Sequence, residues 1–258
     1  MNIQTSTDGT KRILNPDGYI TVLIPSKDDK WCVCVSCQLG CPIGCKFCWT
    51  GKLKRNLTAE EIVAQFTLAK EILGKTPTSV VFMGMGEPMM NFKAVEPAIY
   101  ELNKQFSLPF KRITLSTSGF YLDKLLDVPY HVALSLHTPF DSVREKLMPQ
   151  RHTVAELLDF TREYSKRKKF GLMIQYALMK GVNDRDEDLA EILRLDWPKN
   201  IFFNLIEYNN KGEFTRSERL LEFKEAIRDA GYKCFIRHSR GSDIDAACGM
   251  LEISKSSE

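Results

Sequence analysis

Hydrophobic positions along this chain follow two spacings, one typical of strands and one typical of helices. Short apolar runs end at polar or glycine-rich motifs, and between them lie longer stretches with an apolar residue every three or four positions. One of these stretches begins with Thr58 and Glu61, a pair typical of a capping box, and ends at Gly74. A second capping box, at Thr153 and Glu156, opens another stretch. Each of these patterns predicts an amphipathic helix.

The two spacings alternate about six times along the chain. The apolar runs predict strands at residues 19–24, 31–36, 79–83, 112–115, 131–136, 171–178, 201–206 and 233–236. The longer stretches predict helices at residues 58–74, 89–102, 153–166, 187–195 and 217–230. This order favours an α/β fold with a parallel sheet and outer helices, curled into a full or partial barrel. The first 18 residues are polar, and we expect them to form an irregular lead-in.

Polar or glycine-rich motifs stand at the predicted ends of these strands. The motifs are the cysteine-rich loop at 41–48, GMGEP at 84–88, STSG at 116–119, SLH at 135–137 and two asparagines at 209–210. In a parallel barrel, chemistry takes place at the carboxyl ends of the strands, where such motifs meet. We therefore expect them to line one site.

Three thiols lie within eight residues, at Cys41, Cys45 and Cys48. Three thiolates can hold three irons of a cubic iron–sulfur cluster and leave the fourth iron open to a small molecule. A zinc site is an alternative, since five further cysteines lie elsewhere, but such sites usually use two separated ligand pairs. A disulfide framework is disfavoured, because eight cysteines among 258 residues are too few for a disulfide scaffold. The triplet therefore indicates a catalytic iron–sulfur cluster.

The remaining strand-end motifs suit an amino-acid-bearing nucleotide. Glycines at 84 and 86 let the backbone approach a ligand closely, and Glu87 offers a carboxylate to an ammonium group. Ser116, Ser135 and Asn209 offer neutral hydrogen-bonding groups to a carboxylate or a ribose. An open iron beside such a pocket indicates S-adenosylmethionine (SAM) as the ligand.

Composition narrows the class of protein only slightly. The length fits one large or two small domains, and 43% hydrophobic residues are enough for a substantial core. A net charge of +3 permits a polyanionic partner without requiring one. We find no export signal and no apolar run near the ~20 residues that span a bilayer. We therefore expect a cytoplasmic protein with no membrane association, divided into a lead-in and β-hairpin at 1–36 and a barrel at 37–258.

The chain resembles a known family. The cysteine spacing CxxxCxxC is the signature of radical SAM enzymes, and several longer segments are similar to the RlmN/Cfr family of RNA adenine methyltransferases. These segments lie at residues 34–41, 55–58, 81–88, 114–119, 133–137, 181–184 and 240–249. The resemblance extends over roughly residues 20–251, and the segment at 240–249 is its most specific part.

The resemblance implies a partial (β/α)6 barrel with a short N-terminal β extension, a [4Fe–4S] cluster and SAM. The cluster ligands would be Cys41, Cys45 and Cys48. Two further cysteines would be catalytic: Cys248 becomes methylated by one SAM, and Cys34 later forms a transient disulfide with it. The residues that match the SAM-contacting positions of the family are Gly86, Glu87, Ser116, Ser135, His137 and Asn209.

The implied reaction is methylation of an adenine ring carbon of rRNA or tRNA, at C2 rather than C8, through the methylated cysteine. The resemblance also implies an electron donor such as flavodoxin or ferredoxin, and we expect a monomer. Two alternatives remain: the same mechanism on another acceptor, such as a small RNA, a nucleotide or a non-nucleic-acid substrate, and a non-catalytic RNA-binding relative.

The sequence departs from the family pattern in a few places. Family members usually carry a helical accessory domain before the core, whereas about 18 residues precede the first predicted strand here. The family also has an acid–base glutamate in the strand before the cysteine region, and Ile20 occupies that place. In addition, Trp49 follows the cysteine triplet where a small residue is usual, and Cys37 replaces a serine. We expect the first difference to bear on the substrate. At the place of the glutamate, either another group serves as the acid–base group or the reaction differs.

Overall fold

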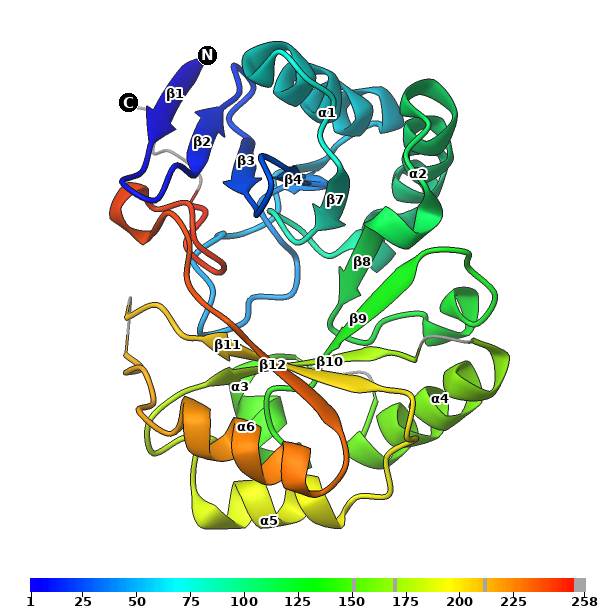
Figure 1. Ribbon diagram of the computed structural model, residues 1–258, viewed down its shortest axis with the longest axis vertical. Coiled ribbons are helices and arrows are strands. Elements are labelled where there is room, and N and C mark those ends of the chain that lie inside the picture. Colours follow the sequence, from blue (N-terminus) through cyan, green and yellow to red (C-terminus); the bar gives the residue numbers. More distant parts are fainter. Residues whose placement is uncertain (150–151, 169–170, 211–212, 253–258) are drawn as a thin grey trace.

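The computed structural model of the protein describes residues 1–149, 152–168, 171–210 and 213–252 (Figure 1). Within these residues, one continuous sheet has the strand order β1-β2-β3-β4-β7-β8-β9-β10-β11-β12. Its strands are β1 (Asn2–Thr5), β2 (Lys11–Leu14), β3 (Ile20–Pro25), β4 (Trp31–Cys34), β7 (Ser79–Phe82), β8 (Ile113–Thr117), β9 (His131–Ser135), β10 (Met173–Leu178), β11 (Phe202–Glu207) and β12 (Lys233–Arg237). Two short strands, β5 (Gln38–Leu39) and β6 (Arg55–Asn56), pair with each other beside it.

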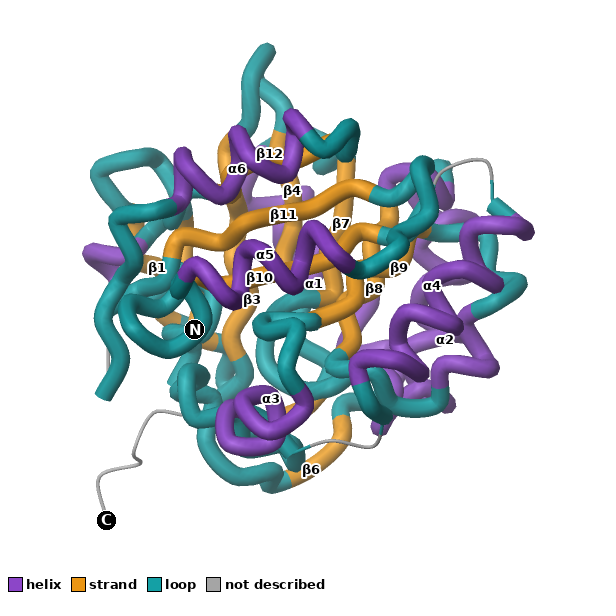
Figure 2. Tube along the Cα trace, turned by 90° about the horizontal axis from the view of Figure 1, so that it is seen from below, coloured by secondary structure: helices purple, strands orange, loops and turns teal. Residues whose placement is uncertain are grey.

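The sheet is antiparallel from β1 to β4 and parallel from β4 to β12. It curls into a partial barrel, and the larger helices lie on its outer side (Figure 1). Seen from below, α5 and α6 lie over the last strands of the sheet, β10 to β12 (Figure 2). The helices are α1 (Ala59–Leu73), α2 (Phe92–Phe106), α3 (Asp141–Leu147), α4 (Val154–Arg167), α5 (Asp186–Arg194) and α6 (Leu220–Asp229). The α/β partial-barrel prediction is confirmed.

The capping boxes form as the sequence predicts. The amide of Glu61 donates to Thr58 Oγ1 at 3.2 Å, and Glu61 Oε2 accepts from the amide of Thr58 at 2.8 Å. The helix then ends at Gly74, which has a φ of +65° in the left-handed region. These local signals fix the bounds of α1 because they provide partners for backbone groups that the helix itself leaves unpaired.

Two features of the fold differ from the prediction. Residues 1–18, expected to be irregular, contain the β1–β2 hairpin at the edge of the sheet. Its strands carry few buried side chains, with Ile13 as the fully buried one, so no apolar alternation revealed them. The short helix α3 was also missed, because its inner face is formed by Arg144 and Leu147 and does not look hydrophobic.

The predicted division at residue 36 stays a prediction. Strand β4, on one side of this boundary, pairs in parallel with β7 on the other, so the sheet crosses it. The hydrophobic core likewise extends from Ile13 and Ile20 at one end of the sheet to Ile227 of α6 at the other.

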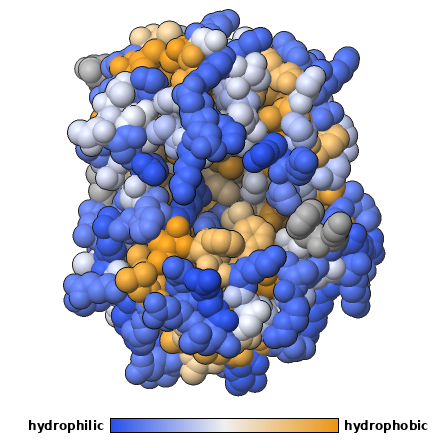
Figure 3. All heavy atoms as spheres, viewed as in Figure 1, coloured by the Kyte–Doolittle hydropathy of each residue, from blue (hydrophilic) through white to orange (hydrophobic). Residues whose placement is uncertain are grey.

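The face seen in Figure 1 is hollowed at its centre, with polar residues above the hollow and a hydrophobic patch below it (Figure 3). Across the described residues, every helix is too short or too polar to cross a membrane.

Candidate functional site

The loop that carries the three thiols follows β4, and amide side chains from neighbouring elements hold its start. Gln65 of α1 accepts from the amide of Ser36 at 2.9 Å and donates to the Ser36 carbonyl at 2.8 Å. Asn91, at the end of the 3₁₀ helix η1 (Pro88–Asn91), donates to the carbonyl oxygens of Cys37 and Leu57, at 2.8 Å each. Because both amide side chains are buried, these bonds fix the loop relative to α1 and η1.

The loop is also tied to two distant segments. The amide of Lys46 donates to the carbonyl of Leu147 at the end of α3, at 2.8 Å. The amide of Trp49 donates to the carbonyl of Gly249 at 2.8 Å. The second bond joins the thiol loop to the segment that carries Cys248, although about 200 residues separate them in the sequence.

The three thiols share one pocket with five of the six predicted SAM-contacting residues. The pocket encloses about 970 Å³ of space, a volume that includes solvent at its open mouth. The predicted residues on its wall are Cys41, Cys45, Cys48, Gly86, Glu87, Ser116, Ser135 and His137. The sixth, Asn209, lies on the wall of an adjoining pocket. Four of the five strand-end motifs therefore line one pocket, and the asparagine motif lies at the adjoining one.

Glu87 is a buried carboxylate in this pocket, with 4% of its surface exposed. Its Oε2 accepts from the amide and the hydroxyl of Ser118, both at 2.8 Å, and its Oε1 accepts from the amide of Met89 at 3.1 Å. Burial raises the pKa of Glu87 above its ordinary value, and these hydrogen bonds offset the rise only in part. A carboxylate that is fixed and desolvated in this way suits an ammonium group.

His137 is a neutral side chain at the pocket wall. Its Nδ1 accepts from the amide of Ala177 at 3.0 Å, which assigns the ring proton to Nε2. Burial, reinforced by the nearby charge of Arg144, lowers the pKa of His137 to about 3. The ring packs edge-on against Phe47 of the thiol loop, with 4.8 Å between centroids. At neutral pH, His137 can therefore donate a hydrogen bond without adding charge.

Gln175 of β10 is a pocket residue that the sequence analysis missed. Its Oε1 accepts from the hydroxyl of Ser116 at 3.4 Å, and its carbonyl accepts from the amides of Leu136 and His137, at 3.0 and 3.3 Å. The side chain is 4% exposed. A polar residue in the middle of an otherwise apolar strand is the signal that could have identified it.

Arg144 of α3 was also missed, although it organises two of the predicted motifs. Its guanidinium is almost fully buried and donates to four backbone carbonyls: Leu136 at 3.1 Å, Ser118 at 2.8 Å, Ser135 at 3.0 Å and His152 at 3.3 Å. Burial lowers the pKa of Arg144 to about 10, so it stays charged at neutral pH. A single buried cation thus ties the ends of β8 and β9 together.

We expect Arg144→Met to lower the free energy of unfolding by about 3 kcal/mol or more, because it leaves several buried carbonyl oxygens without a donor. Denaturant unfolding monitored by circular dichroism measures this change. Arg162→Met is the matched control, since the Arg162 side chain lies at the surface of α4 in an ion pair with Asp159, and its loss should change stability by about 0.5 kcal/mol or less. Equal losses in both variants would contradict the role of Arg144.

The glycines of GMGEP make room for the protein's own backbone. A Cβ at Gly84 would lie 2.6 Å from the carbonyl oxygen of Val35, and one at Gly86 would lie 2.7 Å from Gln38 Cβ. Gly86 also has a φ of +102°, which a side chain would strain. The motif therefore packs directly on the loop that follows β4. Close approach to a bound ligand, the role expected from the sequence, remains a prediction.

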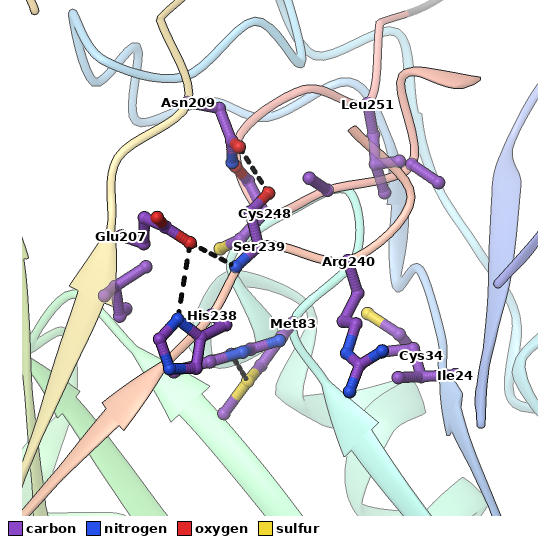
Figure 4. Close-up of a pocket in the computed structure, with 14 residues that line it drawn as sticks. Ile24, Cys34, Met83, Glu207, Asn209, His238, Ser239, Arg240, Cys248 and Leu251 are labelled. Carbon is purple, nitrogen blue, oxygen red and sulfur yellow. Dashed lines mark hydrogen bonds and ion pairs between the residues drawn. The ribbon is translucent and has the colours of Figure 1, made fainter. Parts of the chain in front are cut away.

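The adjoining pocket brings together the two remaining cysteines of interest (Figure 4). Cys34 comes from the end of β4, and Cys248 comes from the segment that follows β12. Asn209 also lines this pocket, and its Nδ2 donates to the carbonyl of Cys248 at 3.1 Å. Cys248 lines both pockets, so it stands between the thiol triplet and Cys34.

The two cysteines differ in their surroundings. Cys248 is exposed, whereas Cys34 is buried. Burial raises the pKa of Cys34 to about 12, although the charge of Arg237 opposes the rise. Cys34 is therefore a protonated thiol in the resting protein at neutral pH. Ile20, at the place of the family's glutamate, is fully buried and provides a carbonyl oxygen to Ser36 Oγ at 2.5 Å.

The donor set of the first pocket fits an iron–sulfur cluster. Burial raises the pKa of all three thiols of the triplet, for Cys41 to about 12, which favours the protonated form. The positive charge of bound iron would stabilise the thiolates instead. Among the described residues, no three His, Cys, Asp or Glu side chains are grouped around a single metal position. A [4Fe–4S] cluster does not need such a group, because each thiolate binds its own iron.

Comparisons with known proteins identify relatives of this chain. Residues 35–193 match the family model described as the Radical SAM superfamily. The chain is 40% identical to the dual-specificity RNA methyltransferase RlmN of Marinomonas sp. (strain MWYL1), across 95% of this chain and 74% of the relative. Its structure matches that of a radical SAM methyltransferase from Sphaerobacter thermophilus with a TM-score of 0.87 and 37% identity, across 97% of this chain and 80% of the other.

A more distant match shows the fold alone. The structure of SuiB from Streptococcus suis matches with a TM-score of 0.58 and 14% identity, across 80% of this chain and 48% of the other. The family model and the closer relatives together assign the chain: it belongs to the radical SAM superfamily, within the methyltransferase family that includes RlmN, and is a radical SAM methyltransferase that uses a [4Fe–4S] cluster and SAM.

Proposed function

We propose that the protein methylates a ring carbon of adenine in RNA, at C2 rather than C8, through a methyl group carried on Cys248. The observation that carries this proposal is the position of Cys248, which lines both the pocket of the thiol triplet and the pocket of Cys34. The name of the Marinomonas relative, a dual-specificity RNA methyltransferase, supports RNA as the substrate. Two cysteines that line one pocket suit a mechanism with a protein-bound carbon.

The roles of the residues follow from their surroundings. Cys41, Cys45 and Cys48 would hold the cluster, and Glu87, Gly86, Ser116, Ser135 and His137 would hold SAM beside it. When bound, the cluster and SAM supply the methyl group and the radical chemistry that activates it. The Cys248 sulfur would first accept the methyl group. For the methyl carbon to bond to the adenine ring, the SAM-derived radical would take one hydrogen from the methyl group, and the ring carbon would lose its own hydrogen as a proton and one electron, which the cluster would accept.

Release of the product requires a second sulfur. Cys34 lines the same pocket as Cys248, and its thiolate can attack the Cys248 sulfur. A Cys34–Cys248 disulfide forms, the bond between Cys248 and the transferred carbon breaks, and that carbon keeps the electron pair and takes up a proton to become the methyl group of the product. Asn209 would hold the Cys248 segment in place through the hydrogen bond to its carbonyl.

Methylation of Cys248 tests the proposal. We expect peptide mass spectrometry of the isolated, cluster-containing protein to find one methyl group on Cys248 and none on Cys34. Cys248→Ala should lose the modification and all methyl transfer to RNA while keeping its iron. An unmodified Cys248 in protein with an intact cluster would refute the mechanism.

Glu87→Gln is expected to weaken SAM binding about tenfold to a hundredfold, because it removes a charged hydrogen-bond partner of the ammonium group. Calorimetric titration of the cluster-containing protein measures the affinity. Since burial raises the pKa of Glu87, binding to the unaltered protein should also weaken as the pH falls toward that pKa, and the variant should lose this dependence. Glu101→Gln, at an exposed position of α2, is the control and should bind SAM normally. An unchanged affinity in Glu87→Gln would remove Glu87 from the site.

Three further features belong to the proposal. The enzyme would receive electrons from a donor such as flavodoxin or ferredoxin, act as a monomer and reside in the cytoplasm. The substrate would be rRNA or tRNA, with the target adenine splayed out of its stack so that it reaches the pocket of Cys34 and Cys248. Incubating the enzyme with SAM, a reductant and separated RNA pools identifies the substrate, because label should enter one pool.

A further inference from the structure

Two turns from opposite ends of the described chain meet beside the site. One is the turn at residues 6–10 of the β1–β2 hairpin, and the other is the turn at residues 241–246 that precedes Cys248. In Figure 1 the blue hairpin lies against the red segment that carries this cysteine. We call the contact between the two turns the clasp.

The clasp consists of reciprocal bonds between carboxylates and partners in the opposite turn. Asp243 Oδ2 accepts from the amide of Thr7 at 3.1 Å, and its Oδ1 accepts from the hydroxyl of Ser6 at 2.5 Å. In the other direction, Asp8 Oδ2 accepts from the amide of Gly241 at 3.0 Å. Arg240 lies 4.0 Å from the same oxygen of Asp8. Each turn thus provides a carboxylate to an amide of the other.

Each turn is also closed internally, so the partners are held in place. In the hairpin, Asp8 N donates to Ser6 Oγ at 3.2 Å and Thr10 N donates to Asp8 Oδ1 at 2.9 Å. In the other turn, the carbonyl of Gly241 accepts from the amide of Ala246 at 2.9 Å. The hydrogen bonds from Ser6 and Thr7 lower the pKa of Asp243 below its ordinary value, so its carboxyl group is ionised at neutral pH.

Close packing accompanies the hydrogen bonds. Gly241 is buried and has a φ of +67°, and a Cβ there would lie 2.8 Å from Thr10 Cγ2 and 2.9 Å from Ala246 Cβ. The hairpin therefore contacts the second turn without a gap. Such a fit is expected where two segments form one fixed arrangement.

The clasp lies on one side of Cys248, and other contacts lie on the opposite side. Downstream, the Gly249 carbonyl accepts from Trp49 N, and Asn209 donates to the Cys248 carbonyl. Upstream, Asp243 is five residues from Cys248, and Ala247 between them is buried. The exposed side chain of Cys248 is therefore presented from a short segment that is anchored at both ends.

We propose that Asp243 and Asp8 are positioning residues that hold the Cys248 segment against the two pockets through the clasp. This inference rests on the proposed function where it concerns catalysis, since it assigns the hairpin a part in presenting the methyl-carrying cysteine. The anchoring itself is a property of the fold and can be measured separately.

Hydrogen–deuterium exchange of the cluster-containing protein tests the anchoring. In Asp243→Ala, we expect amides of the peptide around residues 244–251 to exchange about tenfold faster, while those of α5 and β10 stay unchanged. Ser242→Ala is the matched control: this exposed neighbour takes part in none of the clasp bonds, and its exchange should equal that of the unaltered protein. Asp243→Ala combined with Asp8→Ala should exchange little faster than either single variant, because both residues serve one contact.

A second measurement connects the clasp to catalysis. The fraction of Cys248 that carries a methyl group should fall in Asp243→Ala while iron content and the unfolding midpoint stay near those of Ser242→Ala. Unchanged exchange in Asp243→Ala would overturn the clasp. Faster exchange with an unmodified Cys248 in every variant would leave the clasp standing and refute the proposed function instead.

Discussion

Replacing Cys45 with alanine should remove the iron–sulfur cluster and with it all methyl transfer. The thiol lines the pocket of the triplet, and burial raises its pKa, so in the unaltered protein a bound iron is what stabilises its thiolate. With two thiols left, the pocket cannot hold three irons. The cluster content of anaerobically purified protein should fall from one cluster per chain to nearly none. Iron and sulfide analysis and the visible absorbance of the cluster measure this content.

Cys37→Ser is the control that makes this result specific. Cys37 lies four residues before the triplet and is buried, but its Sγ contacts the carbonyl of Met85 at 3.6 Å and it does not line the pocket. A serine hydroxyl can make the same contact, so the variant should retain its iron. Full iron content in Cys45→Ala, or loss of iron in Cys37→Ser, would show that the ligand set is wrong.

The local signals in the sequence were sufficient for most of the barrel. Capping boxes at Thr58 and Thr153, with Gly74 as a stop, act within a few residues, and the structure forms them as predicted. Four of the five strand-end motifs lie in one pocket because parallel strands place their carboxyl ends at one edge of the sheet, a rule that needs no knowledge of distant contacts.

The elements that were missed depend on contacts between distant residues. The β1–β2 hairpin has little apolar alternation, and part of its contact surface is a carboxylate, Asp243, more than 230 residues away. Arg144 occupies an inner position of α3 because four carbonyl oxygens surround it there, and no spacing rule indicates that arrangement. Asn209 donates a hydrogen bond to the Cys248 carbonyl, a contact that no motif indicated, and its expected contact with SAM stays a prediction.

Replacing Cys34 with alanine should leave RNA covalently joined to Cys248. Without a second sulfur the disulfide cannot form, so the bond between Cys248 and the transferred carbon has no route to cleavage. A denaturing gel after incubation with SAM, reductant and RNA should show a slower protein band that nuclease treatment removes. Cys32→Ala is the matched control, because Cys32 lies two residues away in the same strand and outside the pocket. An absence of this band in Cys34→Ala protein whose Cys248 is methylated would exclude Cys34 from product release.

The buried position of Cys34 adds a pH dependence to this step. Burial raises its pKa to about 12, and only the thiolate attacks sulfur. At pH values below that pKa, the thiolate fraction increases about tenfold for each unit by which the pH rises. The joined species in the unaltered enzyme should therefore decay faster as the pH rises between about 7 and 9. Arg237→Gln should slow this decay at each pH, because Arg237 lowers the pKa of Cys34. Rapid quenching at several pH values measures the decay, and a rate independent of pH would mean that another group starts the release.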